Sequence, residues 1–85
     1  MYYMIEIAVI RRHILNKEFS MATCYCGHLL NEIENDYICA FESHDEFWNR
    51  ILQDNIMRSY VRSIIALDRL ATRHNLEELR YRMAV

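Results

Sequence analysis

The chain contains no proline and a single glycine, Gly27, and this scarcity constrains its fold more than any other feature. Tight turns between β-strands need glycine or proline at positions of special backbone geometry, so an all-β fold is disfavoured. Hydrophobic residues make up 53% of the sequence, which excludes a disordered chain. The 85 residues are expected to form one helical interaction domain, residues 1–85, near the lower size limit for a domain with its own core.

Capping residues mark three expected helix starts. Ser43 can cap the first free amides of a helix, and Glu46 can reach back to the Ser43 amide, which together form a capping box. The other two expected starts are Ser20, for a helix over about residues 21–33, and Asn75, for a helix over about residues 76–84.

The apolar face of residues 45–74 changes direction along the chain. At about 100° per residue, the apolar side chains before residue 54 and those after residue 55 centre on directions roughly 140° apart. We therefore place a break or kink near Asp54 and Asn55, because such residues compete for the backbone and favour caps over helix interiors. The alternative is an unbroken helix buried on two sides.

The first fifteen residues fit two structures. Their apolar and β-branched residues alternate as in a strand, but a helix that is apolar nearly all round fits equally well. We favour a helix, so the predicted fold is all-α, a small bundle of four to five helices. The alternative is a hairpin of residues 3–10 with 19–26, which would make the fold α+β.

Cysteine usage and the N-terminal sequence bear on localisation. Three cysteines are an odd number, which argues against a disulfide framework and favours a reducing compartment. Glu6 interrupts the apolar residues 1–10, which are too few to span a bilayer and lack the charge pattern of a signal peptide. We expect a cytoplasmic protein that makes no contact with a membrane.

The cysteines and histidines in the middle of the chain are the residues most typical of a metal site. Its candidate ligands are Cys24, Cys26, His28, Cys39 and His44. One residue between Cys24 and Cys26 is a poor match to zinc spacing, and on a helix these two side chains point about 200° apart. A zinc module therefore requires this segment to be extended, and we expect no metal and no other cofactor. The simpler interpretation is that the cysteines are small buried hydrophobes.

Charge is distributed unevenly along the chain. Seven acidic residues against Arg50 alone fall between residues 32 and 54, whereas six arginines against three acidic residues follow residue 56. Opposite-sign halves in so short a chain indicate that the halves meet, within one subunit or between two.

Four arginines form a stripe that is the predicted partner-binding surface. On a helical wheel they fall within about 60° of one another. They are Arg58, Arg62, Arg69 and Arg73. A solvated face, partly paired with the acidic middle of the chain, is the simplest interpretation of the stripe; as a binding surface it would contact nucleic acid or an acidic protein partner.

Nucleic acid is a second possible ligand of this arginine stripe, which would make the chain a small transcriptional regulator. Two observations weaken this interpretation. The net charge is −2, and a helix-turn-helix built from residues 56–73 and 76–84 would place Glu77 and Glu78 where phosphates and base edges lie.

Nothing in the sequence indicates an enzyme. A single glycine cannot build a phosphate-cradling loop, and no nucleophile elbow or positioned acid–base pair is present. We instead expect a small protein–protein interaction module, a regulatory adaptor or inhibitor of a larger protein, that forms a homodimer through the apolar helix at about 56–73. The predicted self-association residues are Met57, Tyr60, Val61, Ile64 and Leu67.

Overall fold

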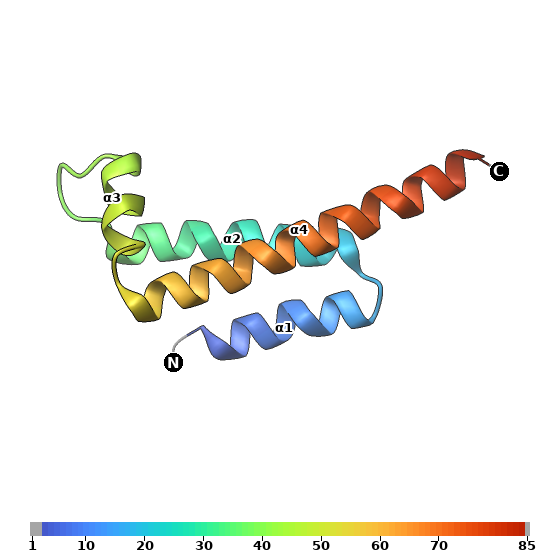
Figure 1. The fold of residues 1–85 in the computed structure, drawn as a ribbon, viewed down its shortest axis with the longest axis horizontal. Helices are drawn as coiled ribbons and strands as arrows, with labels where there is room; N and C mark the ends of the chain where they lie inside the picture. Colours follow the sequence, from blue (N-terminus) through green and yellow to red (C-terminus); the bar gives the residue numbers. More distant parts are fainter. Residues whose placement is uncertain (1–2, 85) are drawn as a thin grey trace.

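The computed structural model describes residues 3–84 and shows four helices and no strand within that range (Figure 1). The helices are α1 (Met4–Leu15), α2 (Phe19–Tyr37), α3 (His44–Ile51) and α4 (Asn55–Ala84). The prediction of a small all-α bundle is confirmed, and the favoured helix at the N-terminus is present as α1. Residues 4–10 and 19–26 are helical, so the alternative hairpin is absent; residues 1, 2 and 85 lie outside the described range.

Helix α4 packs along α2, α1 packs against both, and the short α3 lies against α2 at one end of the molecule (Figure 1). The core is apolar because each long helix presents residues three or four positions apart to the others. Its most deeply buried large side chains are Phe47, Ile10, Leu29, Ile33, Ile64, Val61 and Cys26. Each of the large aliphatic or aromatic residues contributes roughly 1.5–3 kcal/mol by leaving water.

One of the three predicted helix starts is confirmed, and so is the predicted break near Asp54 and Asn55. The Ser43 hydroxyl accepts a hydrogen bond from the Glu46 amide at 3.2 Å, at the start of α3. The Asp54 carboxylate accepts hydrogen bonds from the amides of Ile56, at 3.0 Å, and Met57, at 2.9 Å, at the start of α4. The helical conformation is therefore interrupted between Ile51 and Asn55. Because of this interruption, the apolar faces of α3 and α4 both pack against one core.

The other two predicted starts are wrong. Helix α2 begins at Phe19, so Ser20 lies inside it. Helix α4 runs without interruption through Asn75, so the helix-turn-helix considered for the nucleic-acid alternative does not form. Contacts with the beginning of α2 hold this part of α4: Phe19 stacks on His74 with ring centroids 5.2 Å apart, and the Ser20 hydroxyl donates to Asn75 Oδ1 at 3.5 Å.

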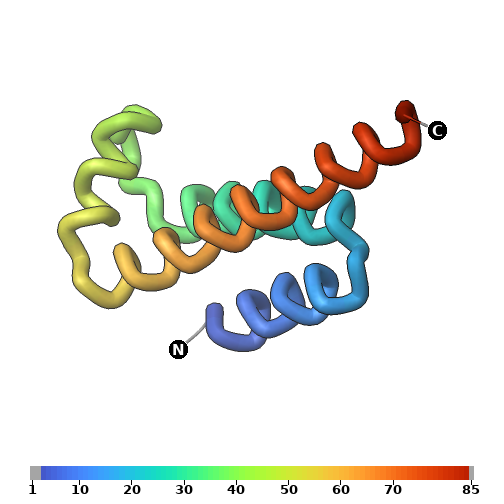
Figure 2. Tube along the Cα trace, turned by 45° about the vertical axis from the view of Figure 1, so that its right-hand side comes forward, coloured from blue at the N-terminus to red at the C-terminus, as the bar shows by residue number. Residues whose placement is uncertain are grey.

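Helix α4 extends beyond the rest of the bundle, as Figures 1 and 2 show from two directions. It has 30 residues against 19 in α2, and the molecule is 51 Å long. Residues 76–84 lie past the stacked pair Phe19–His74 and are all exposed. We call these residues the overhang.

The candidate site: an apolar groove and an exposed loop

The predicted self-association residues lie against the core of a single copy. Val61 is 2% exposed and Ile64 is 0% exposed. The other three predicted residues, Met57, Tyr60 and Leu67, are half-buried and pack against the same core. The apolar face of α4 is therefore used by α1 and α2 of its own chain, which corrects the placement of the predicted dimer seam.

The arginine stripe lies on the opposite side of α4. Arg62, Arg69 and Arg73 are exposed and form no ion pair with any residue between 3 and 84. Arg58 donates a hydrogen bond to Asn55 Oδ1 at 2.7 Å rather than to Asp54. The predicted pairing of the stripe with the acidic middle of the chain is therefore absent among the described residues, and three guanidinium groups remain available to a partner.

An apolar groove of about 450 Å³ opens between α2, α3 and α4. Helix α4 contributes Val61 and Ile65, and α3 contributes Trp48. The remaining lining residues are Gly27, Leu30, Asn31, Glu34, His44 and Leu52. Three helices from distant parts of the sequence thus form one apolar concave surface.

Gly27 lines this groove in the middle of α2. A Cβ atom at this position would meet nothing within 4 Å, and the glycine does not have a positive φ. Neither packing nor backbone geometry therefore requires glycine, although glycine inside a helix costs about 0.5–1 kcal/mol relative to alanine. The missing side chain keeps the groove open.

Glu34 and His44 form the polar edge of the groove. His44 Nδ1 lies 2.6 Å from Glu34 Oε1, which joins α3 to α2. The Glu34 side chain is 18% exposed, whereas the His44 side chain is 67% exposed. The groove therefore has an apolar floor and an acidic group at its edge.

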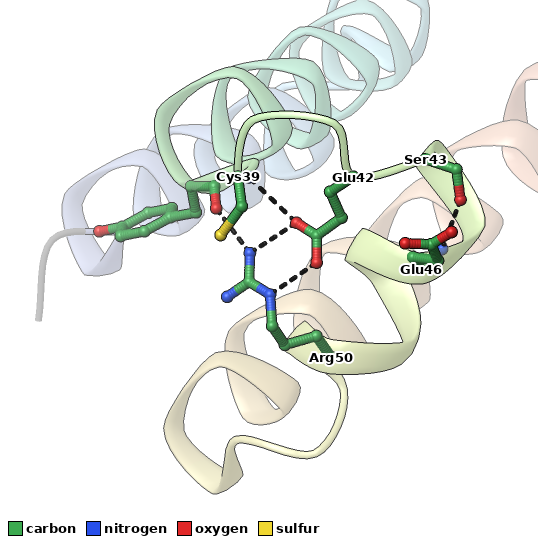
Figure 3. Close-up of polar contacts among 6 residues, drawn as sticks. Cys39, Glu42, Ser43, Glu46 and Arg50 are labelled. Atoms are coloured by element: carbon green, nitrogen blue, oxygen red, sulfur yellow. Dashed lines mark hydrogen bonds and ion pairs between the residues drawn. The ribbon is translucent and has the colours of Figure 1, made fainter.

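A network of hydrogen bonds fixes the loop between α2 and α3 (Figure 3). Arg50 donates two hydrogen bonds to the Glu42 carboxylate, and Arg50 Nη2 also donates to the Tyr37 carbonyl at 2.7 Å. The Cys39 amide donates to Glu42 Oε1 at 3.0 Å. These bonds lower the pKa of Glu42 to about 2 and raise the pKa of Arg50.

The same loop presents Phe41 to solvent. Phe41 is fully exposed and has a φ of 67°, which is a left-handed conformation that non-glycine residues seldom adopt. Residues 38–41 are all apolar and all exposed, and we call them the apolar loop. An ordered loop with a strained backbone and an exposed aromatic tip is typical of a binding surface.

The overhang carries a second exposed apolar surface. Leu76 is 49% exposed, Leu79 is 46% exposed and Met83 is 86% exposed. Their spacing of three and four residues puts them on one stripe of the helix. Arg80 lies beside this stripe on the same helix.

The candidate metal ligands do not come together. Cys24 is exposed and Cys26 is buried on the helix α2, so the extended segment that a zinc module requires is absent. Burial raises the pKa of the Cys26 thiol to about 11. Within residues 3–84, no group of three or more Cys, His, Asp or Glu side chains is placed to hold a metal ion.

Sequence reasoning missed the groove and the apolar loop. Gly27 was a usable signal, since it lies between predicted helix positions where glycine is unfavourable. Phe41 gave no signal because its exposure depends on hydrogen bonds between residues far apart in the sequence, such as Arg50 and Tyr37.

No family model matches the chain, and comparison with curated proteins and with solved structures gives no significant match either. None of the helices within the described range is both long and apolar enough to cross a membrane.

Proposed function

We propose that the chain is a non-catalytic protein–protein interaction module, a small regulatory adaptor or inhibitor that holds an amphipathic helix of its partner in the apolar groove. The observation that carries this proposal is the groove itself, which is apolar, open, and kept open by the glycine at position 27. A groove between helices is a recurrent way to bind the apolar face of a helix.

Two further surfaces support binding of a larger protein. The apolar loop presents Phe41, and a large aromatic side chain that enters a partner pocket can supply much of the binding energy of an interface. The free guanidinium groups of Arg62 and Arg69 lie on the same helix as the groove residue Ile65. They select an acidic partner and speed its association, and so act on specificity more than on affinity.

A photo-crosslinking amino acid at position 31 tests this proposal. Asn31 is an exposed residue of α2 that lines the groove, so a benzophenone group there lies beside the occupant while the groove above Gly27 stays open. In an extract of cells that express the protein, we expect one discrete protein adduct. The matched control carries the same group at Arg11, which is exposed on α1, and should give no adduct. Equal reaction at both positions, or none at position 31, would contradict the proposal.

A nucleic-acid-binding regulator is the second candidate, because four arginines share one face of a single continuous helix. Electrophoretic mobility of DNA and RNA at low salt tests it. Binding that is lost on replacing Arg62 and Arg69 with glutamate, and that falls linearly with the logarithm of salt concentration, would favour this function over the first.

A further inference from the structure

We infer that the helix held in the groove is the overhang of a second copy, in an antiparallel dimer with two-fold symmetry. This inference rests on the proposed function, since it names the occupant of the same groove. Three observations support it: the position of the two surfaces on α4, the charge at the two ends of the molecule, and the apolar character of both surfaces.

The groove and the apolar stripe of the overhang lie on the same face of α4. At about 100° per residue, Leu76, Leu79 and Met83 all fall within about 40° of the groove residue Ile65. At 1.5 Å per residue, Leu79 lies about 21 Å from Ile65 along the helix. Thr72 lies midway between Ile65 and Leu79. A two-fold axis that crosses α4 near Thr72 places Leu79 of the second copy opposite Ile65 of the first copy, and Leu79 of the first copy opposite Ile65 of the second.

This arrangement needs only one surface, repeated in both copies, as a two-fold interface requires. Thr72 lies at its centre and is exposed, and its small side chain lets the two α4 helices approach each other. The dimer then contains two equivalent contacts. In each contact, the overhang of one copy occupies the groove of the other copy.

The charges of the two ends are complementary. The acidic residues between 32 and 54 lie around α3 and the end of α2, whereas Arg80 and Arg82 lie on the overhang at the opposite end of a 51 Å molecule (Figures 1 and 2). These ends are too far apart to meet within one copy. The antiparallel dimer brings Arg80 of one copy to the end of the molecule where Glu34 borders the groove of the other.

Both surfaces are apolar and exposed in a single copy. The groove of about 450 Å³ has room for side chains of the size of leucine and methionine, and it is lined by Leu30, Trp48 and Ile65. Leu79 and Met83 are 46% and 86% exposed. Docking removes both surfaces from water, which is the main driving force of association.

Sedimentation of the full-length chain over a range of concentrations tests the dimer. We expect wild type to dimerise, and Gly27→Leu and Leu79→Glu each to raise the dissociation constant about tenfold or more, as hot-spot changes do. A leucine at position 27 adds a side chain to the wall of the groove at a place where its Cβ meets nothing within 4 Å. The control Tyr81→Glu changes an exposed side chain on the other side of the overhang and should leave the constant within about threefold.

A mixture of the two variants provides the sharpest test. Gly27→Leu keeps a working overhang and Leu79→Glu keeps a working groove, so a one-to-one mixture should form a heterodimer at concentrations where each variant alone is monomeric. Trp48 is the sole tryptophan and lines the groove, so its emission should shift to shorter wavelength when the groove fills. Far-ultraviolet circular dichroism confirms that both variants are folded.

A wild-type monomer at high micromolar concentration, or a dimer that neither variant weakens, would overturn the inference. If the monomer nevertheless gives a discrete adduct with a different protein at position 31, the interaction module stands and only the second copy is excluded. An adduct between two copies at position 31 supports both.

Discussion

Arg50 on α3 holds Glu42 in the preceding loop through two hydrogen bonds, one from Nε to Oε2 at 2.8 Å and one from Nη2 to Oε1 at 2.9 Å. Paired bonds of this kind are stronger and more directional than a single ion pair. Because the same guanidinium also donates to the Tyr37 carbonyl, the end of α2, the loop and α3 are joined at one side chain. The conformation that exposes Phe41 therefore depends on the Arg50–Glu42 pair.

The first prediction concerns the pH dependence of this pair. The folded-state pKa of Glu42, about 2, lies below its ordinary value of 4.5, so the pair stabilises the fold above pH 4.5 and loses that effect as the pH falls toward 2. Wild type should therefore have a higher melting temperature than Glu42→Gln at neutral pH. The difference should narrow below pH 4.5 and close near pH 2. A difference that stays constant down to pH 2 would contradict the assignment.

The second prediction separates the three cysteines by their reactivity. Burial raises the pKa of Cys26 to about 11, so its thiol stays protonated and shielded at neutral pH, whereas Cys24 and Cys39 are exposed. A thiol reagent at about pH 8 should modify Cys24 and Cys39 rapidly and Cys26 only after denaturation. Mass spectrometry of the labelled peptides locates the modified residues, and Cys26→Ser, which should react to the same extent as wild type, serves as the control.

The third prediction concerns the backbone at Phe41. Its φ of 67° costs roughly 1–2 kcal/mol in a non-glycine residue, and its exposed ring has no packing to lose. Phe41→Gly should therefore keep or raise the free energy of unfolding, by up to about 1 kcal/mol, measured by urea denaturation. Under the proposed function, the same change should also weaken binding of a larger protein partner, so that binding and stability respond differently to the loss of the ring. A clear loss of stability would show that the ring packs against the protein.

The fourth prediction compares two adjacent isoleucines. Ile64 is 0% exposed in the core, and Ile65 is 36% exposed and lines the groove. Ile64→Ala should lower the free energy of unfolding by about 2–5 kcal/mol, because it leaves a cavity, whereas Ile65→Ala should cost much less. Ile65→Ala should instead weaken self-association. If the effects of the two changes on stability were reversed, the two faces of α4 would be assigned incorrectly.

Local capping chemistry explains which parts of the fold the sequence could predict. The side-chain oxygen atoms of Ser43 and Asp54 accept hydrogen bonds from amides in the first turns of α3 and α4. Both helix starts can therefore be predicted from residue type and spacing. The turn between α1 and α2 has no such signal. There Lys17 adopts a φ of 61°, and the Glu18 amide donates to the His13 carbonyl, in a turn without glycine or proline.

Periodicity showed that α4 is apolar beyond one narrow stripe, but it could not identify the neighbour. Val61 and Ile64 fit a dimer seam and a subunit core equally well until the position of α2 is known, because both place the same residues on one helical face. The groove was hidden for a related reason. Its lining comes from α2, α3 and α4, so it depends on how three helices pack rather than on any one segment.

The last prediction concerns the effect of Asn75→Ala on stability. Because Asn75 lies inside α4 and not at a helix start, the expected sign of this effect is reversed. At a helix start, replacing asparagine with alanine costs about 0.5–2 kcal/mol, since a capping oxygen is lost. Inside a helix, alanine is the better helix former by several tenths of a kcal/mol, and the 3.5 Å contact with Ser20 is too long to outweigh this gain. Asn75→Ala should therefore keep or slightly raise the melting temperature.

Asp54→Ala is the matched control for Asn75→Ala, because the Asp54 carboxylate caps the amides of Ile56 and Met57. Its loss should cost about 1 kcal/mol and lower the melting temperature by roughly 4–8 °C. Opposite signs for the two changes identify a single helix that begins after Asp54 and continues through Asn75. Equal losses would instead indicate a helix start at Asn75 and a separate helix over residues 76–84, which would exclude the overhang of a continuous α4.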